Sequence, residues 1–226
     1  MLAEERFVFG STQEILGEDL IVLADWPSFQ AIFEDLPADA YLSDGGTYRQ
    51  RRFGRFIYTS DDNELVLQPH RPYSQPKYFN PLNGGMKRHF APLTEAILNN
   101  RVVQRVLQLL GTGYSTLEDQ PCWRINTYFN RIVTCAEEMG KPVPEGMHRD
   151  GVKFSCLLMA NHINFTGGNS TLFDMLTHKP VFEGRLGAGG QMLVFRDDAV
   201  LHNTTDIRPA DPKLSGYRDV LVIEFY

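Results

Sequence analysis

The chain has 226 residues, 42% of them hydrophobic and 22% charged, a globular balance that can bury a core without disulfide bonds. A formal net charge of −6 and a pI of about 5.5 argue against a general nucleic-acid partner, because such binders are usually basic. The three cysteines form no C-x-x-C pair, so a reducing cytoplasm is expected. No signal peptide or membrane-spanning apolar run is evident, so no membrane partner is expected.

The first 120 residues are mixed in character and form the more helical part of the chain. Residues 26–33 predict a short helix that opens at a proline, with apolar side chains at helical spacing. Residues 48–81 are basic and aromatic and could pair as outer strands. Residues 92–110 carry an apolar stripe that predicts one or two helices, with Gly111 as the candidate stop.

Residues 121–226 are rich in β-branched and aromatic residues, with Gly, Pro, Asn and Asp between the apolar runs. Short strands separated by such turn signals are typical of a sandwich or a barrel. The expected strands are residues 123–134, 152–160, 170–173, 191–195, 199–202 and 217–225. Helices ahead of this region would pack on one face of it. We therefore expect one mainly β domain over residues 1–226, with residues 1–120 packing on a core formed by residues 121–226.

His148 and Asp150 stand two residues apart in the segment Glu145-Gly146-Met147-His148-Arg149-Asp150-Gly151. In an extended segment such residues project to the same side, so an imidazole and a carboxylate can reach one ion. Two histidines and one carboxylate leave open positions on Fe(II) for other ligands. We select His202 as the third ligand, because it is the one histidine expected on a β element late in the chain.

An isolated H-x-D triplet is weak evidence, since most such triplets are surface coincidences. His-Arg-Asp also begins the protein-kinase catalytic loop. The kinase interpretation fails here, because the downstream asparagine is misplaced, no D-F-G follows, and no glycine-rich loop with a strand lysine precedes.

With its context, the arrangement resembles the Fe(II)/2-oxoglutarate-dependent dioxygenase superfamily. That superfamily has H-x-D/E, a distal His and a later Arg on the last core strand, matched here by His148-Arg149-Asp150, His202 and Arg218. A closer likeness is to a bacterial family of 2-oxoglutarate/Fe dioxygenases that includes free L-isoleucine hydroxylases. This likeness rests on residues 144–151, Asn164, Gly167-Gly168 and residues 216–222, and less specifically on Arg51-Arg52-Phe53, Arg55-Phe56, Gln75, Asn80 and Gly84-Gly85.

The resemblance implies a double-stranded β-helix, or jelly roll, with iron at one open end. Arg218 would pair with the distal carboxylate of 2-oxoglutarate, since a guanidinium binds a carboxylate through two hydrogen bonds and stays charged when buried. Ser170, which follows Gly167-Gly168, would add a hydroxyl contact. Many relatives have Arg-x-Ser where this chain has Arg218-Asp219-Val220, so Thr204 is a second source of a hydroxyl. The alternatives are a surface arginine and an ordinary glycine turn.

Two further groups of residues are candidates to bind the substrate. Arg124, Asn126 and Tyr128 share one face of the strand before the metal loop, and they bind substrate if that face points inward. Arg52 lies in the arginine-rich run 48–56 and could pair with a substrate carboxylate. The alternatives for this run are a charged edge strand and, less favoured in an acidic chain, RNA binding.

Together these features predict a hydroxylase that uses Fe(II), 2-oxoglutarate and O2, and releases succinate and CO2. The resemblance favours a free L-amino acid or a similar small metabolite as substrate. Two alternatives remain open. A cupin-like metal enzyme of another reaction class would bind its metal mainly through histidines and need no equivalent of Arg218. A non-catalytic jelly-roll module would need no complete ligand set. The sequence does not indicate an oligomeric state.

Overall fold

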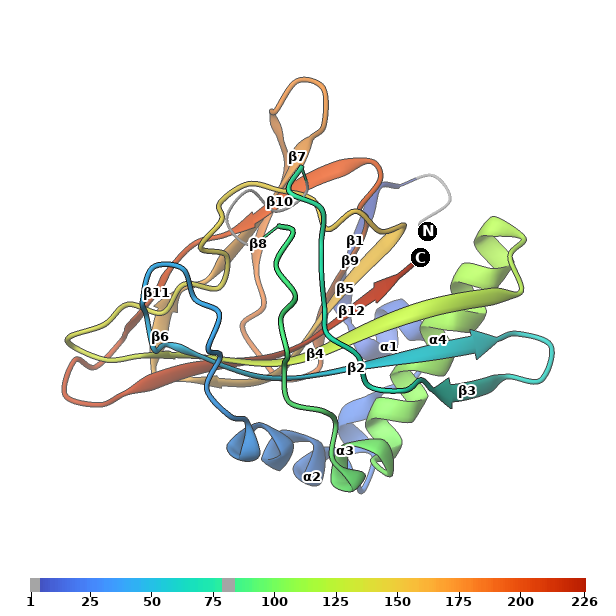
Figure 1. Ribbon diagram of the computed structural model, residues 1–226, viewed down its shortest axis with the longest axis horizontal. Coiled ribbons are helices and arrows are strands. Elements are labelled where there is room, and N and C mark those ends of the chain that lie inside the picture. The colour runs from blue at the N-terminus through green and yellow to red at the C-terminus, as the bar shows by residue number, and fades with distance from the viewer. Residues whose placement is uncertain (1–4, 79–83) are drawn as a thin grey trace.

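The computed structural model describes residues 5–78 and 84–226. Its centre is a seven-stranded antiparallel sheet with the order β1-β9-β5-β12-β4-β2-β3 (Figure 1). The strands of this main sheet are β1 Phe7–Ser11, β2 Arg49–Thr59, β3 Glu64–Leu67, β4 Cys122–Thr134, β5 Phe154–Ile163, β9 Gln191–Arg196 and β12 Gly216–Phe225. The strands β4, β5, β9 and β12 come from the second half of the chain, and β2 and β3 extend the sheet as the outer strands expected there.

Two smaller sheets form a second layer over the main one. The three-stranded sheet has the order β10 Val200–Thr204, β7 Asn169–Asp174 and β8 Pro180–Arg185. The two-stranded sheet pairs β11 Ile207–Pro209 with β6 Phe165–Gly167. Leu172 and Val200 of the three-stranded sheet are buried, and they pack against Met159, Leu193 and Val220 of the main sheet. This two-layered antiparallel arrangement confirms the mainly β, jelly-roll class that the sequence predicts.

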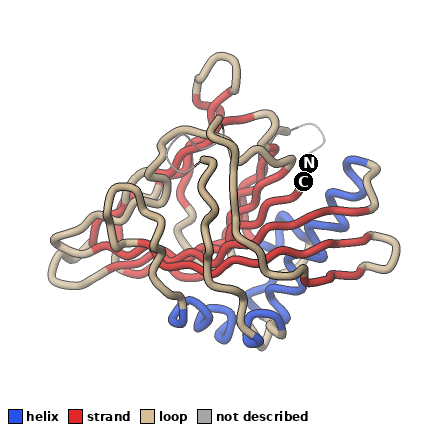
Figure 2. Tube along the Cα trace, in the orientation of Figure 1, coloured by secondary structure: helices blue, strands red, loops and turns tan. Residues whose placement is uncertain are grey.

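The helices gather on the opposite face of the main sheet (Figure 2). They are α1 Thr12–Leu16, α2 Trp26–Ala31, α3 Glu95–Leu98 and α4 Arg101–Glu118, with 3-10 turns at Leu20–Val22 and Ile32–Asp35. The longest, α4, begins where the Asn100 side chain accepts hydrogen bonds from the N–H groups of Val102 and Val103. No helix in the described part of the chain is long and apolar enough to cross a membrane.

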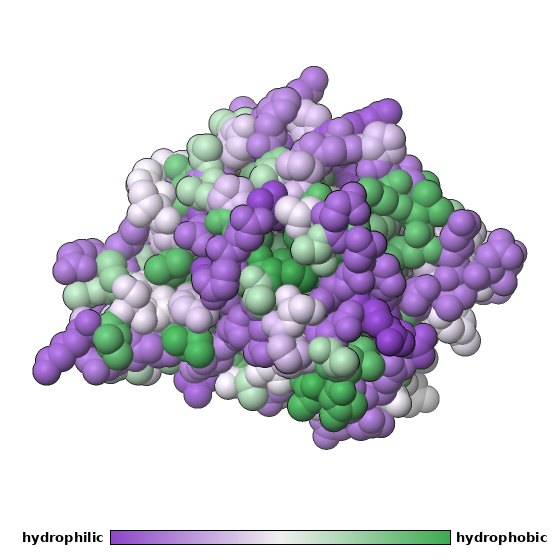
Figure 3. Space-filling view, turned by 90° about the horizontal axis from the view of Figure 1, so that it is seen from below, coloured by the Kyte–Doolittle hydropathy of each residue, from purple (hydrophilic) through white to green (hydrophobic). Residues whose placement is uncertain are grey.

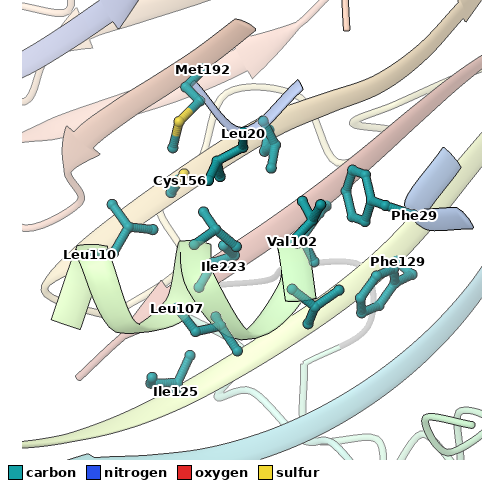
Figure 4. Packing of buried hydrophobic residues seen from close by; sticks show 14 of the residues in the cluster. Leu20, Phe29, Val102, Leu107, Leu110, Ile125, Phe129, Cys156, Met192 and Ile223 are labelled. Carbon is teal, nitrogen blue, oxygen red and sulfur yellow. The ribbon is translucent and has the colours of Figure 1, made fainter. Parts of the chain in front are cut away.

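The main core lies between α4 and the sheet (Figure 4). Val102, Leu107 and Leu110 of the helix face strand residues that include Phe129 and Ile223, and all five are buried. Burying a side chain of this kind stabilises the fold by roughly 1.5–3 kcal/mol. This face of the sheet therefore carries much of the stability.

The predicted end of the long helix at Gly111 is wrong. The helix continues to Glu118 and ends at Asp119, which adopts a left-handed conformation with φ 50°. This position inside the helix is a glycine because a Cβ there would come within 2.5 Å of Cδ1 of Tyr58 on β2. Close packing against the sheet explains this glycine, and the helix does not end there.

The strands expected after residue 120 are present as β4, β5, β7, β9, β10 and β12, with ends shifted by a few residues. The short elements β1, β6, β8, β11 and α1 were not predicted, because segments of three to six residues show little periodicity. Figure 3 shows the surface of the molecule from below the view of Figure 1. Hydrophilic side chains predominate on it, and hydrophobic ones form separate patches.

Alternation along the strands gives the main sheet two different faces. On β12, Leu221 and Ile223 point into the core beneath the helices, whereas Arg218, Val222 and Glu224 line a cavity between the two layers. The cavity is therefore built mainly on the face that the helices leave uncovered.

Candidate metal centre and its cavity

His148 and His202 lie side by side because their backbones pair. The N–H of each residue donates to the carbonyl of the other, at 3.0 and 2.8 Å, and the two ring centroids are 4.3 Å apart. Asp150 follows His148 after a single residue, and one ligand atom from each of the three lies within 4.8 Å of the other two. The fold thus brings all three residues predicted from the sequence within reach of one ion.

The ligand atoms of the triad are oriented by neighbouring groups. Nδ1 of His148 is 2.9 Å from the Gly146 carbonyl, and a proton on Nδ1 would donate there and leave Nε2 to face the cavity. Nε2 lies 3.4 Å from Oδ1 of Asp150. The Ser155 hydroxyl donates to the other carboxylate oxygen at 3.0 Å. This donor set fits an Fe(II) ion, which commonly binds two histidines and one carboxylate.

Asp197, in the turn between β9 and β10, supports both segments that carry the triad. Its fully buried carboxylate accepts the N–H groups of Asp150, Gly151 and Val152 at 2.8, 2.8 and 3.1 Å. Its Oδ1 lies 3.8 Å from Nδ1 of His202. Burial and the charge of Asp150 raise the pKa of Asp197 to about 7. The sequence indicated only a turn here, so the supporting role was missed.

Two residues of the triad, His202 and Asp150, have the charge states that a cation site needs, whereas His148 is protonated at neutral pH. Burial and the neighbouring His148 lower the pKa of His202 to about 4. Burial disfavours ionised Asp150, but the two histidines and the Ser155 hydroxyl hold the pKa of that carboxyl well below its usual range. Burial also opposes protonation of His148, yet Asp150 raises the pKa of His148 to about 9. A metal must therefore displace one proton, from His148.

Arg218 reaches the same cavity from β12. It pairs in register with Ile132 of β4 and His162 of β5, and only 5% of the residue is exposed. Burial lowers the pKa of Arg218 to about 10, so the guanidinium keeps its charge at neutral pH. Its Nε and Nη2 atoms are buried and have no hydrogen-bond partner within the described ranges. Orphaned donors on a buried cation fit a carboxylate ligand such as that of 2-oxoglutarate.

The two predicted hydroxyl groups face each other across β10 and β7. Oγ of Ser170 and Oγ1 of Thr204 are 3.1 Å apart, and both residues are buried. Thr204 lines the cavity, whereas Ser170 lies behind it on β7. Gly167, just before this strand, has φ 82° and a Cβ there would lie 2.2 Å from the Asp206 carbonyl oxygen, which explains the glycine turn.

The predicted substrate residues divide into two groups. Tyr128 lines the cavity, and Asn126 lies behind Glu224 and donates to its carboxylate at 2.8 Å, so this part of the strand face points inward. Arg124 is exposed near the start of β4, with its guanidinium over the Tyr226 ring. Arg124 lies outside the cavity, although it is on the same face of β4 as Asn126 and Tyr128.

The structure also does not bring Arg52 to the cavity. Its guanidinium lies 3.0 Å from the Asp35 carboxylate and donates to the Pro92 carbonyl, on the face that carries the helices. Arg49 and Arg51, which alternate with it on β2, line the cavity instead. The structure therefore places the neighbours of Arg52, and not Arg52 itself, at the cavity, because periodicity does not say which face of a strand points inward.

Other cavity residues were suggested weakly or not at all. Gln75 of the resemblance lines the cavity and donates to the Asp150 carbonyl at 3.2 Å. Arg88 and Glu224 also line it and were not singled out. Asn80, another residue of the resemblance, lies outside the described residues.

Comparison with known proteins decides the family. A model described as 2OG-Fe dioxygenase matches residues 30–224. This chain belongs to the 2OG-Fe dioxygenase family. It is 27% identical over 172 residues to the 3(1)-hydroxy-L-isoleucine 4-dioxygenase of Pantoea ananatis, a match covering 74% of this chain and 68% of that protein.

Two solved structures share the fold of this chain. A BsmA homologue from Methylobium petroleophilum is 30% identical and superposes with a TM-score of 0.87, covering 99% of this chain and 89% of that one. IDO from Bacillus thuringiensis shares the fold at 19% identity and a TM-score of 0.78, covering 98% and 90%. This 2OG-Fe dioxygenase is therefore a non-haem enzyme that uses Fe(II), 2-oxoglutarate and O2, as the sequence predicts. The family favours this reaction class over a cupin-like enzyme or a non-catalytic module.

Proposed function

We propose that this dioxygenase hydroxylates a free L-amino acid or a similar small metabolite. In this proposal His148, Asp150 and His202 hold the iron, and Arg218 binds the distal carboxylate of 2-oxoglutarate. The main support is the buried guanidinium of Arg218, which lies in the same cavity as the triad and whose Nε and Nη2 have no hydrogen-bond partner among the described residues. The choice of an amino acid is supported by the name of the relative from Pantoea ananatis, which acts on a hydroxylated L-isoleucine.

The chain's own residues would position the reactants. Bound Fe(II), 2-oxoglutarate and O2 would supply the oxidising chemistry, with succinate and CO2 as co-products. Gly146 and Asp197 hold the two segments that carry the ligands, so that the triad is preorganised. Arg218 would fix one end of 2-oxoglutarate, with Thr204, or Ser170 behind it, contributing a hydroxyl. Asn126 and Tyr128 would lie on the substrate side.

The proposal is tested by turnover with a panel of free amino acids. Protein supplied with Fe(II), 2-oxoglutarate and ascorbate in air should form a product 16 mass units heavier from at least one amino acid, with matching succinate. Hydroxylation gives this mass, whereas desaturation would give a loss of 2. Failure to stimulate succinate formation with any amino acid of a broad panel would contradict the proposed substrate class.

We also propose that the chain acts as one dioxygenase domain on a small molecule in the cytoplasm. The helices and β1–β3 pack on the same sheet that carries Arg218, which supports a single unit. Cys122, Cys135 and Cys156 are all free thiols, which supports a reducing compartment. The acidic balance of the chain supports a partner other than nucleic acid.

A further inference from the structure

Arg51 and Arg88 form a second group of buried cations in the cavity. Arg51 is 8% exposed and Arg88 is 4% exposed, and both line the cavity together with the triad. The Nε atom of Arg88 has no hydrogen-bond partner among the residues described, whereas that of Arg51 makes an ion pair with Asp39. Arg51 pairs in register with Asn130, on the cavity face of β4, whereas Arg218 pairs with Ile132. The two groups of cations therefore occupy different positions on the sheet.

The positive charge of this pair is not fully balanced by protein groups. Oδ2 of Asp39 lies 2.8 Å from Nε of Arg49 and 3.0 Å from Nε of Arg51, so one carboxylate serves two guanidinium groups. Arg88 donates to the neutral amide of Gln75 at 3.1 Å and makes no ion pair with a described residue. Leaving a buried cation without a counter-charge is costly, so the pair is suited to bind an anion.

Two aromatic rings lie against the guanidinium group of Arg88. The guanidinium carbon lies 4.8 Å from the centroid of the Tyr73 ring and 5.5 Å from that of Phe90. That of Arg51 lies 4.8 Å from the Phe90 centroid. Stacking fixes the planes of both groups without using their N–H donors.

A carboxylate lies on the other side of the same aromatic group. Glu224 is buried, and its Oε2 accepts hydrogen bonds from Asn126 and from the Tyr128 hydroxyl at 2.8 and 3.1 Å. Tyr73, which packs under Arg88, also contacts the Tyr128 ring at 5.4 Å. The cations and the carboxylate thus flank one pair of tyrosines.

We propose that Arg51 and Arg88 bind the α-carboxylate of the substrate and that Glu224 binds its α-ammonium group. This inference rests on the proposed function and specifies how the amino acid is recognised. Two arginines and a carboxyl group at two places in one cavity match a free zwitterion. Burial and the charge of Asp150 raise the pKa of Glu224 well above its usual range, and a bound ammonium group would favour the ionised form. An amino-acid amide, or a residue whose carboxyl group is in a peptide bond, lacks the carboxylate. A 2-hydroxy acid lacks the ammonium group.

The first test changes the ligand and leaves the protein intact. Protein loaded with Ni(II) and 2-oxoglutarate, which does not turn over, is titrated by calorimetry with L-isoleucine, L-isoleucinamide and 2-hydroxy-3-methylpentanoate. If the panel identifies another amino acid, that compound and its analogues replace these three. Losing one partner of a buried charge pair typically weakens binding by about 30-fold or more. Each analogue should show a loss of this size, and equal binding of the amide would overturn the assignment to Arg51 and Arg88.

The second test uses variants on the two faces of β2. Arg51→Met and Arg88→Met should each raise KM for the amino acid by about 30-fold, while KM for 2-oxoglutarate stays within about threefold. Arg52→Met is the matched control, because it removes the same charge from the neighbouring residue on the helix face. A rise in KM for 2-oxoglutarate instead would show that the pair serves the co-substrate, and would refute the inference.

Glu224→Gln tests the other half of the proposal. It should bring the affinities of the amino acid and the 2-hydroxy acid within a few-fold of each other, because the counter-charge for the ammonium group is gone. Unchanged discrimination would remove Glu224 from the proposal. Hydroxylation of an amino acid with normal KM in both arginine variants would refute this inference and leave the proposed function intact. Absence of turnover with every amino acid would refute the proposed function itself.

Discussion

The two faces of the main sheet differ in composition although they are built from the same strands. Beneath the helices, β12 presents Leu221 and Ile223, which are fully buried among apolar neighbours. On the opposite face the same strand presents Arg218 and Glu224, also buried, but in a cavity with the triad. A charged group is expensive to bury. The cavity face therefore lowers the stability of the empty protein and is suited to ligands that complete it.

We expect substitutions on the two faces to affect different properties of the protein. Substitutions on the helix face should change the free energy of unfolding, whereas substitutions on the cavity face should change binding and turnover. A variant that does the opposite would break the distinction.

His148→Ala should abolish measurable turnover while the protein keeps its fold. Removing one ligand leaves two donors for the iron, whereas the apolar core lies on the other face. Succinate release measures the first effect and circular dichroism the second. His178→Ala, in an exposed turn, is the control and should stay active. An active His148→Ala enzyme would refute the proposed metal site.

Leu221→Ala should lower the free energy of unfolding by about 2–5 kcal/mol, as is usual for a leucine deleted from a packed core. Its neighbour Val222 lines the cavity and is only partly buried, so Val222→Ala should cost less stability. Urea denaturation of both variants measures the difference. A larger loss for Val222→Ala would contradict the division of roles between the faces.

Arg218→Met should raise KM for 2-oxoglutarate by about 30-fold or more, because two charge-assisted hydrogen bonds to its carboxylate are lost. Arg208→Met, on an exposed position of β11, controls for the change in net charge. Initial rates over a range of 2-oxoglutarate concentrations give the result. If KM for 2-oxoglutarate does not move, another cation must bind the co-substrate.

Asp197→Asn should weaken metal binding by about 10–100-fold, the usual effect of losing a group that orients metal ligands. The two oxygens of Asp197 accept three N–H groups, and in asparagine one oxygen becomes an NH2 group that faces a donor. Asp198→Asn, at a surface ion pair, is the matched control. Equal Co(II) affinity in both variants would contradict the supporting role.

The affinity for Co(II), used in place of Fe(II), should rise about tenfold per pH unit between pH 6.5 and 8.5. The folded pKa of His148 is raised to about 9, so below that pH each metal ion must displace one proton, and low pH weakens binding. His202 and Asp150 contribute little in this range, because their pKa values lie well below it, whereas Asp197, whose pKa is about 7, would make the rise steeper below that pH. Titration at fixed ionic strength measures the slope, and a flat profile would contradict the assignment.

The sequence by itself indicated the chemistry of the site and most of the strands that carry it. His148 and Asp150 are two residues apart, and His202 and Arg218 lie on strands with clear apolar patterns, so local spacing was informative. It also located α2, α3, α4 and the outer strands of the first half, but not α1. The helices and strands depend on short-range periodicity, which the chain displays directly, whereas the role of Arg218 was implied by the resemblance to the dioxygenase superfamily.

Only the tertiary structure decided which face of each strand points into the cavity. Alternation groups Arg49 with Arg51 and sets Arg52 apart, but the inward side depends on which face the helices cover. Asp197 meets the metal loop from a turn more than 40 residues away. Gly111 likewise reflects contact with Tyr58 on a distant strand. Each of these is a long-range contact, and such contacts leave no periodic trace in the sequence.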